Sequence, residues 1–299
     1  MTASCPAPTP RARRALGLLL ASLALLGQRA GEAAPAGKGA PRRIAALSPS
    51  AAEILFALGA APRVVAVSDF TDDLPEAKGK VRVGGFNPDL ERLLALSPDL
   101  VVVSRDGTDR AAYERIVALR LPVVVTSATT LKGVLSDVET VGRAVGEEVR
   151  ATQLAAASRA RIAAAEDRAR RAQAARPFPS VAVVIWPDPP VLAGPRSFVG
   201  DLLLTARARN VVPESAPEWP RVSHEALAGW DPGLLVRPDT PENADAFRRA
   251  FTADPRWRLV GAARAGRVAT LPGAWLERPT PRLVDALEKL VDLLAEAGR

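Results

Sequence analysis

The stretch Glu91-Arg-Leu-Leu-Ala-Leu-Ser-Pro-Asp-Leu-Val-Val102 has a counterpart in Glu225-Ala-Leu-Ala-Gly-Trp-Asp-Pro-Gly-Leu-Leu-Val236. In both stretches a glutamate opens a short apolar helix, a proline follows the helix, and an apolar strand comes next. A phrase repeated at half the length of the chain predicts two lobes of like construction. It also predicts two exposed carboxylates, Glu91 and Glu225, in equivalent places, one in each lobe.

The N-terminal half of the chain alternates between strands and helices. Ser50 with Glu53 fits a capping box at the start of the first helix, and Gly59 suits the left-handed position at its end. The continuous apolar runs favour strands that are buried on both faces of a parallel sheet. We expect strands at 43–47, 64–67, 100–103 and 121–125, with helices around 90–96 and 109–119.

The middle of the chain has a different composition, because it lacks proline and is rich in Ala, Arg and Glu from 147 to 175. This composition predicts one long helix with little apolar surface, acting as a stiff connector. Beyond it, strands are expected at 180–186, 234–236 and 268–271, with a final helix near 281–297. The predicted fold is therefore α/β, with two lobes of mainly parallel sheets joined by one long backbone helix and a ligand cleft between the lobes.

The N-terminus has the pattern of an export signal, with Arg11, Arg13 and Arg14 before an apolar core and small residues after it. The only cysteine, Cys5, precedes that core, so the mature chain has none. We expect a periplasmic protein that is soluble after cleavage. The predicted divisions are a signal peptide (1–33), a disordered leader (34–41), an N-terminal lobe (42–146), a connecting helix (147–176) and a C-terminal lobe (177–299).

Most enzyme and metal motifs are missing from the sequence. His224 is the only histidine, so a structural zinc site is excluded, and no nucleophile elbow or phosphate-binding glycine loop is present. Asp69, Asp72 and Asp73 cluster in a turn, where such residues usually cap backbone N–H groups. The net charge of +7 is spread along the chain rather than gathered in a patch. We therefore predict no catalytic residues, no metal site, no enzyme activity and no nucleic-acid partner.

Aromatic residues make up only 4% of the chain, so their placement is informative. Several stand at strand ends or in loops flanked by Pro or Gly, where open α/β sheets bind their ligands. Large rings in such places predict a cleft that stacks on a large, flat ligand. The candidates are Phe70, Phe86, Trp186, Trp219 and Trp275.

Nearly all of the mature chain resembles the substrate-binding proteins of ABC importers, in the class with a helical backbone between the lobes. The resemblance rests on Leu47-Ser-Pro-Ser-Ala-Ala-Glu53, Gly84-Gly-Phe-Asn-Pro-Asp-Leu-Glu91 and Ser97-Pro-Asp-Leu-Val-Val102. Two further stretches are similar to the periplasmic cobalamin-binding branch of the class. They are Trp219-Pro-Arg-Val-Ser-His-Glu225 and Trp275-Leu-Glu-Arg-Pro-Thr-Pro-Arg282.

The resemblance implies a role for individual residues. Glu91 and Glu225 match the carboxylates that dock on the dimeric membrane permease, and Arg278 is expected to meet the polar side chains of a corrin. Phe70, Phe86, Trp219 and Trp275 match aromatic positions that line the corrin cleft. The protein is thus expected to be a monomer that carries cobalamin or a related corrinoid as a transported ligand, without a cofactor. A ferric siderophore remains an alternative, and haem is a weaker one because few axial ligands are available.

Overall fold

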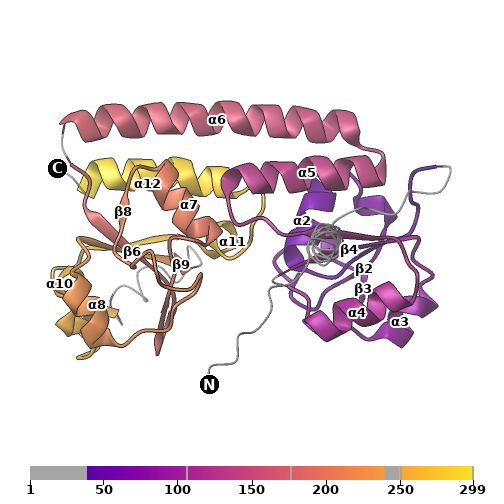
Figure 1. Ribbon diagram of the computed structural model, residues 1–299, viewed down its shortest axis with the longest axis horizontal. Helices are drawn as coiled ribbons and strands as arrows, with labels where there is room; N and C mark the ends of the chain where they lie inside the picture. Colours follow the sequence, from indigo (N-terminus) through magenta and orange to yellow (C-terminus); the bar gives the residue numbers. More distant parts are fainter. Residues whose placement is uncertain (1–38, 106, 176, 240–248, 250, 298–299) are drawn as a thin grey trace, which may run out of the picture. The chain divides into compact units, whose positions relative to one another are not determined.

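The described part of the chain is built on two sheets, one in each lobe. The computed structural model describes residues 39–105, 107–175, 177–239, 249 and 251–297 (Figure 1). The predicted signal peptide, 1–33, lies outside the described residues, as does most of the predicted leader, 34–41. Within the described ranges, no helix is both long enough and apolar enough to cross a membrane.

The sheet of the N-terminal lobe has five strands in the order β3-β2-β1-β4-β5, and every neighbouring pair is parallel. The apolar runs of the sequence predict four of them, whereas β3 has only two residues and carries no such pattern. The strands are β1 (Ile44–Ala46), β2 (Val64–Val67), β3 (Val81–Arg82), β4 (Leu100–Ser104) and β5 (Val123–Thr126).

Helices cover both faces of this sheet (Figure 1). Ile44 and Ala46 of β1 face the cluster that includes α2 (Pro49–Ala57) and α5 (Leu131–Val145). Ala45 and Leu47 face the opposite cluster, formed with α3 (Leu90–Ala95) and α4 (Arg110–Ala118). Alternate residues of a strand point to opposite faces, so a strand covered on both sides must be apolar throughout. This explains the continuous apolar runs.

The first helix begins earlier than the sequence predicts. Ser48 is the N-cap of α2, because its side chain accepts a hydrogen bond from the backbone N–H of Ala51. The predicted capping box of Ser50 with Glu53 is therefore wrong. Glu53 lies beyond the first turn and is buried. Gly59 has the expected left-handed conformation, with φ of 76°.

The sheet of the C-terminal lobe follows the order β10-β9-β6-β7, and β8 also pairs with β6. Among the described strand pairs of this lobe, β6–β7 is antiparallel and the others are parallel. The strands are β6 (Ser180–Pro187), β7 (Pro190–Leu192), β8 (Arg209–Asn210), β9 (Leu234–Asp239) and β10 (Val268–Pro272). The described helices of this lobe are α7 (Phe198–Thr205), α8 (His224–Trp230), α10 (Gly261–Arg264), α11 (Gly273–Leu276) and α12 (Leu283–Ala297). The described 3-10 turns are η1 (Ala61–Arg63) and η2 (Pro75–Ala77) in the N-terminal lobe and η3 (Trp257–Leu259) in the C-terminal lobe.

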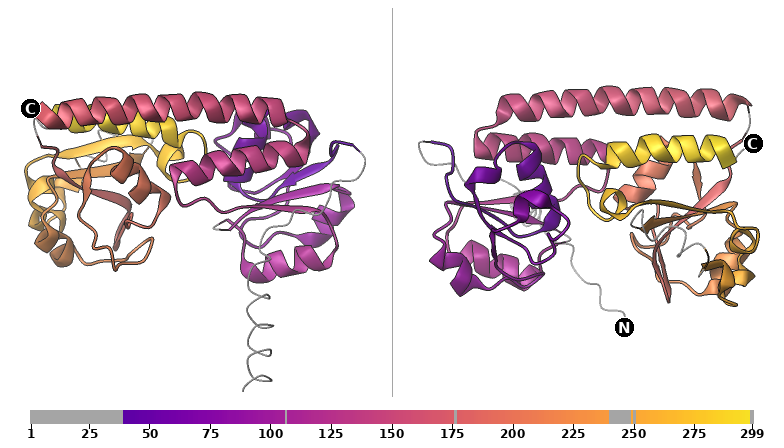
Figure 2. Two further views of the ribbon diagram at one scale, coloured as in Figure 1. Left: turned by 45° about the horizontal axis from the view of Figure 1, so that its top comes forward. Right: turned by 180° about the vertical axis from the view of Figure 1, so that it is seen from behind.

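One long helix, α6 (Glu148–Ala175), joins the lobes as the sequence predicts. In all views it runs along α5 and α12 (Figure 1 and Figure 2). Its small residues make this close packing possible, because Ala151 lies in the core of the N-terminal lobe and Ala165 in that of the C-terminal lobe. Arg161 lies 2.6 Å from both Asp285 and Glu288 of α12, which fixes the two helices against each other.

A second helix, α5, also belongs to both lobes. Leu131 and Val134 at its start lie in the core of the C-terminal lobe, whereas Val138, Val141 and Val145 lie in the core of the N-terminal lobe. The backbone N–H of Leu131 donates to the carboxylate of Asp201 in α7, at 2.7 Å. Because two packed helices are shared between the cores, the lobes can move only a little relative to each other.

Candidate functional site

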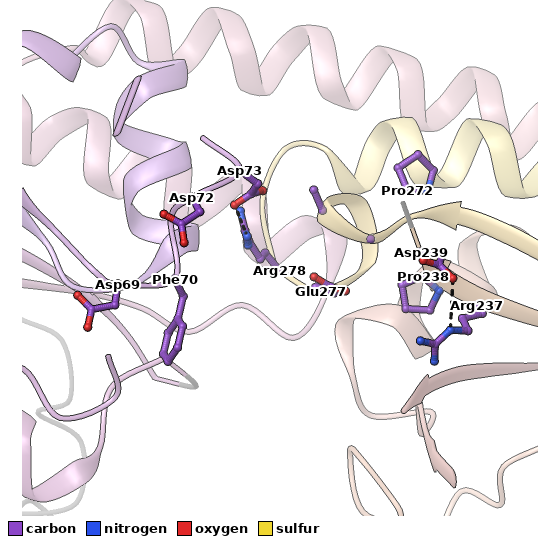
Figure 3. Close-up of a pocket in the computed structure, with 12 residues that line it drawn as sticks. Asp69, Phe70, Asp72, Asp73, Arg237, Pro238, Asp239, Pro272, Glu277 and Arg278 are labelled. Carbon is purple, nitrogen blue, oxygen red and sulfur yellow. Dashed lines mark hydrogen bonds and ion pairs between the residues drawn. The ribbon is translucent and has the colours of Figure 1, made fainter. Parts of the chain in front are cut away.

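A cavity of about 490 Å³ lies between the lobes, at the carboxyl ends of β2, β9 and β10 (Figure 3). We call it the interlobe cavity. The loop after β2 forms the wall on the side of the N-terminal lobe. The ends of β9 and β10, together with the α11 region, form the wall on the side of the C-terminal lobe. Ligands of open α/β sheets bind at such strand ends, and this volume is within the range of ligand pockets. Its lining residues are Asp69, Phe70, Asp72, Asp73, Arg237, Pro238, Asp239, Pro272, Gly273, Ala274, Glu277 and Arg278.

Two phenylalanines form an exposed aromatic pair at this cavity. Phe70 lines it, and Phe86 stacks on Phe70 with ring centroids 5.3 Å apart and planes tilted by 51°. They remain 50% and 56% exposed, which is unusual for large apolar rings. Gly85 lets the ring of Phe70 lie against bare backbone, because a Cβ there would come within 2.7 Å of Phe70 Cε2. The pair therefore offers an apolar surface to a ligand rather than filling the core.

The three predicted tryptophans do not line the interlobe cavity. Trp219 and Trp275 are half-buried against the core of the C-terminal lobe, and Trp219 meets Phe198 edge-on at 5.3 Å. Trp186 is 60% exposed, and its indole N–H donates to the backbone carbonyl of Asp188 in the turn after β6. Of the predicted aromatics, only Phe70 and Phe86 are thus brought together at the cavity wall.

Arg278 lines the interlobe cavity but also ties the lobes together. Its Nη2 lies 2.7 Å from Asp73 Oδ1, and its Nη1 lies 3.7 Å from Glu53 Oε2. Glu53 is also 3.3 Å from Arg282 Nε. Burial raises the pKa of the Glu53 carboxyl above its ordinary value, and Thr280, Arg282 and Arg278 oppose this effect in that order. Arg278 therefore has protein partners in addition to any ligand.

The remaining polar lining is mostly acidic. Asp69 accepts a hydrogen bond from the backbone N–H of Gly84, as expected of an aspartate in a turn. Asp72 instead pairs with the side chain of Arg82, at 2.7 Å. Sequence reasoning missed Arg237, Asp239 and Glu277. The first two stand at the carboxyl end of a predicted strand, and that position could have singled them out.

Glu91 and Glu225 occupy equivalent places in the two lobes. Each is the second residue of a short helix, α3 or α8, and each is exposed. The helices begin at the caps Asp89 and Ser223, and each leads into a strand beside the first strand of its sheet. The pKa of the Glu225 carboxyl is lowered by its own backbone N–H and by the Ser223 hydroxyl. Their exposure leaves both carboxylates accessible to a partner.

Comparison with known proteins agrees with this architecture. A cobalamin-binding protein of Halobacterium salinarum is 28% identical over 259 residues, which cover 84% of this chain and 69% of that protein. A vitamin B12-binding protein of Yersinia pestis is 26% identical over 286 residues, covering 94% and 93%. The crystal structure of a periplasmic haem-binding protein from Pseudomonas aeruginosa matches with a TM-score of 0.76 and 27% identity, covering 87% and 94%.

The family model described as "Periplasmic binding protein" matches residues 44–274. The match begins at β1, ends in α11, and includes both sheets and the helices between them. Proteins of this family bind a transported ligand rather than a cofactor, and they are not enzymes. The chain belongs to the periplasmic binding protein family.

Proposed function

We propose that this protein captures cobalamin or a related corrinoid outside the cytoplasm and delivers it to an ABC importer. The relatives from Halobacterium and Yersinia support a corrinoid, because their names state cobalamin or vitamin B12 as the ligand. The Yersinia protein is matched along nearly its whole length, so the resemblance is not confined to one lobe. Export by the predicted signal peptide and action as a monomer are parts of the same proposal.

The exposed pair Phe70–Phe86 at the interlobe cavity is the observation that carries this proposal. A flat macrocycle can stack on aromatic faces, and exposed rings beside a cavity gain the most from being covered. The two helices shared by the lobes restrict closure, so the cavity is largely formed before the ligand arrives. A pre-formed site suits a ligand that is itself rigid. Trp186, Trp219 and Trp275 remain proposed ligand contacts.

Haem is the second candidate, favoured by the similarity to the Pseudomonas haem-binding protein. Haem iron is usually held by His, Tyr, Met or Cys. Tyr113 and His224 do not line the interlobe cavity. His224 is buried with its ring centroid 4.7 Å from that of Trp257, in the C-terminal lobe. A ferric siderophore is the third candidate, but both arginines of the cavity already lie beside aspartates. The corrinoid therefore ranks first.

Glu91 and Glu225 are the proposed contacts to the permease dimer. Two separated carboxylates offer a charge-steered, two-point contact with a two-fold partner. Their equivalent positions at the starts of α3 and α8 support this role.

Spectral titration of the protein without residues 1–33 tests the ligand assignment. We expect saturable binding of cyanocobalamin at or below micromolar concentration. Haem and a ferric hydroxamate siderophore serve as competitors in the same assay. No binding of cyanocobalamin, together with saturable binding of either competitor, would overturn the corrinoid assignment and leave the transport role with another ligand.

A further inference from the structure

The interlobe cavity has an excess of negative charge. Among the described residues, five carboxylates line it, compared with two guanidinium groups, those of Arg237 and Arg278. The carboxylates come from both lobes and from three separate segments of the chain. They belong to Asp69, Asp72, Asp73, Asp239 and Glu277. A cavity with this lining presents a negative potential to anything that enters it.

The two arginines do not cancel the net negative charge of the lining. Arg278 Nη2 lies 2.7 Å from Asp73 Oδ1, and Arg237 Nε lies 3.8 Å from Asp239 Oδ2. Each cation thus lies beside a carboxylate of the same cavity, as the dashed lines in Figure 3 show. A ligand carboxylate that approaches either guanidinium must compete with an aspartate already in place. The arginines therefore offset only part of the negative charge of the lining, which keeps three more carboxylates than guanidinium groups among the described residues.

Glu277 differs from the other acids of the lining. Among the described residues, no hydrogen bond or ion pair reaches its side chain at contact distance, and the residue is exposed. Figure 3 shows its carboxylate between Arg278 and Asp239. Gly273 makes room for it, because a Cβ at that position would lie 2.9 Å from Glu277 Oε1. The fold therefore places an unengaged hydrogen-bond acceptor in the wall of the cavity.

We propose that Glu277, with the acidic lining around it, makes the cavity select amidated corrinoids and reject corrinoids or porphyrins that carry carboxylates. This inference rests on the proposed function, and it adds the chemical class of ligand that the site accepts. An ionised carboxylate only accepts hydrogen bonds, so it can receive the N–H groups of a peripheral carboxamide. It repels a ligand carboxylate at the same position, and repulsion of the wrong ligand is a common source of specificity.

A matched pair of ligands tests the proposal. Dicyanocobinamide carries carboxamides around the corrin ring, whereas dicyanocobyrinic acid carries carboxylates on the same ring, and both can be titrated by their colour. We expect the carboxylate form to bind at least about tenfold more weakly. The substitution Glu277→Gln keeps the size of the side chain and removes one charge. It should therefore reduce the affinity gap, meaning the ratio of the two dissociation constants, by about fivefold.

Two controls separate charge from shape. Glu296→Gln makes the same change on an exposed residue of α12 outside the cavity, and it should leave the gap unchanged. Raising the ionic strength is the second control. It should narrow the affinity gap between the two ligands, because salt screens exposed charges but does not alter a steric fit.

The outcomes also separate this inference from the proposed function. If both ligands bind equally tightly, selection by charge is overturned while corrinoid binding stands. An affinity gap between the two ligands that responds neither to salt nor to Glu277→Gln would likewise overturn selection by charge. If neither ligand nor cyanocobalamin binds, the corrinoid function fails and the selection fails with it.

Discussion

Arg278 in the C-terminal lobe lies 2.7 Å from Asp73 in the N-terminal lobe, measured from Nη2 to Oδ1. Its other terminal nitrogen lies 3.7 Å from Glu53, and the side chains of Arg278 and Glu53 are only 13% and 8% exposed. Burying charges requires that each has a partner, so this cluster depends on the lobes keeping their spacing. The interlobe cavity is thus bounded by an ionic contact between the lobes in which Arg278 and Glu53 are largely buried and Asp73 is 40% exposed.

Replacing Arg278 by Met should destabilise the protein, because it leaves the Glu53 and Asp73 carboxylates with less compensation. Breaking a buried pair on one side costs roughly 3 kcal/mol or more in free energy of unfolding. Urea denaturation followed by circular dichroism measures this. The matched control is Arg110→Met, which breaks an exposed pair with Glu114 and should cost at most about 1 kcal/mol. Equal losses in the two variants would show that the Arg278 contact adds nothing beyond a surface pair.

The Glu53 carboxyl should make a distinct contribution to the pH dependence of stability. Burial raises its pKa above the ordinary value of 4.5. A group with a raised folded-state pKa stabilises the fold below its unfolded pKa, and this contribution is lost as the pH rises through the folded pKa. The free energy of unfolding of the wild type minus that of Glu53→Gln should therefore increase as the pH falls from 7 towards 4.5. Urea titrations at several pH values give this difference, and a decrease on acidification would mean that the arginines outweigh burial.

The Phe70–Phe86 pair should depend on the absence of a side chain at Gly85. In Gly85→Ala the new Cβ meets the Phe70 ring, so the pair must shift. A ring that stacks on the ligand contributes about 0.5–1.5 kcal/mol beyond its buried area, so displacing the rings should lower the ligand affinity roughly threefold to tenfold. Gly229→Ala is the control, because a Cβ there meets nothing within 4 Å. Calorimetric titration with cyanocobalamin compares the two, and an unchanged affinity in Gly85→Ala would remove the pair from the site.

Docking on the permease should depend on Glu91 and Glu225 without affecting capture. The double substitution to Ala should reduce uptake in transport-competent vesicles by roughly tenfold or more, because both points of a two-point contact are lost. Ligand affinity should stay the same. Glu76→Ala with Glu214→Ala is the matched control, one exposed glutamate from each lobe. Equal uptake by the two double variants would count against docking through these carboxylates.

Much of the fold is predictable from the sequence because burial shapes it locally. The strands β1, β2 and β4 are covered on both faces, which requires unbroken apolar runs. The edge strand β5 is apolar as well, although Val125 is 38% exposed. The helix α6 follows from a long stretch without proline that is rich in Ala, Arg and Glu. The repeat that begins at Glu91 and Glu225 predicts that each residue opens a helix followed by a strand, and the structure shows both.

The site is less predictable because it depends on how the lobes meet. Arg278 and Asp73 are 205 residues apart in sequence, and no local pattern pairs them. Glu53 matches a capping box by spacing, but the helix begins at Pro49 and the carboxylate turns to Arg278 and Arg282. The shared position of α5 in both cores also has no local signature, because its apolar face is continuous.

Native mass spectrometry of the protein as purified from its own cells is the sharpest test of corrinoid transport. We expect a co-purifying ligand whose mass is that of a cobalamin or another amidated corrinoid, bound at one per chain. A co-purifying haem or ferric siderophore in its place would show that the protein carries a different ligand.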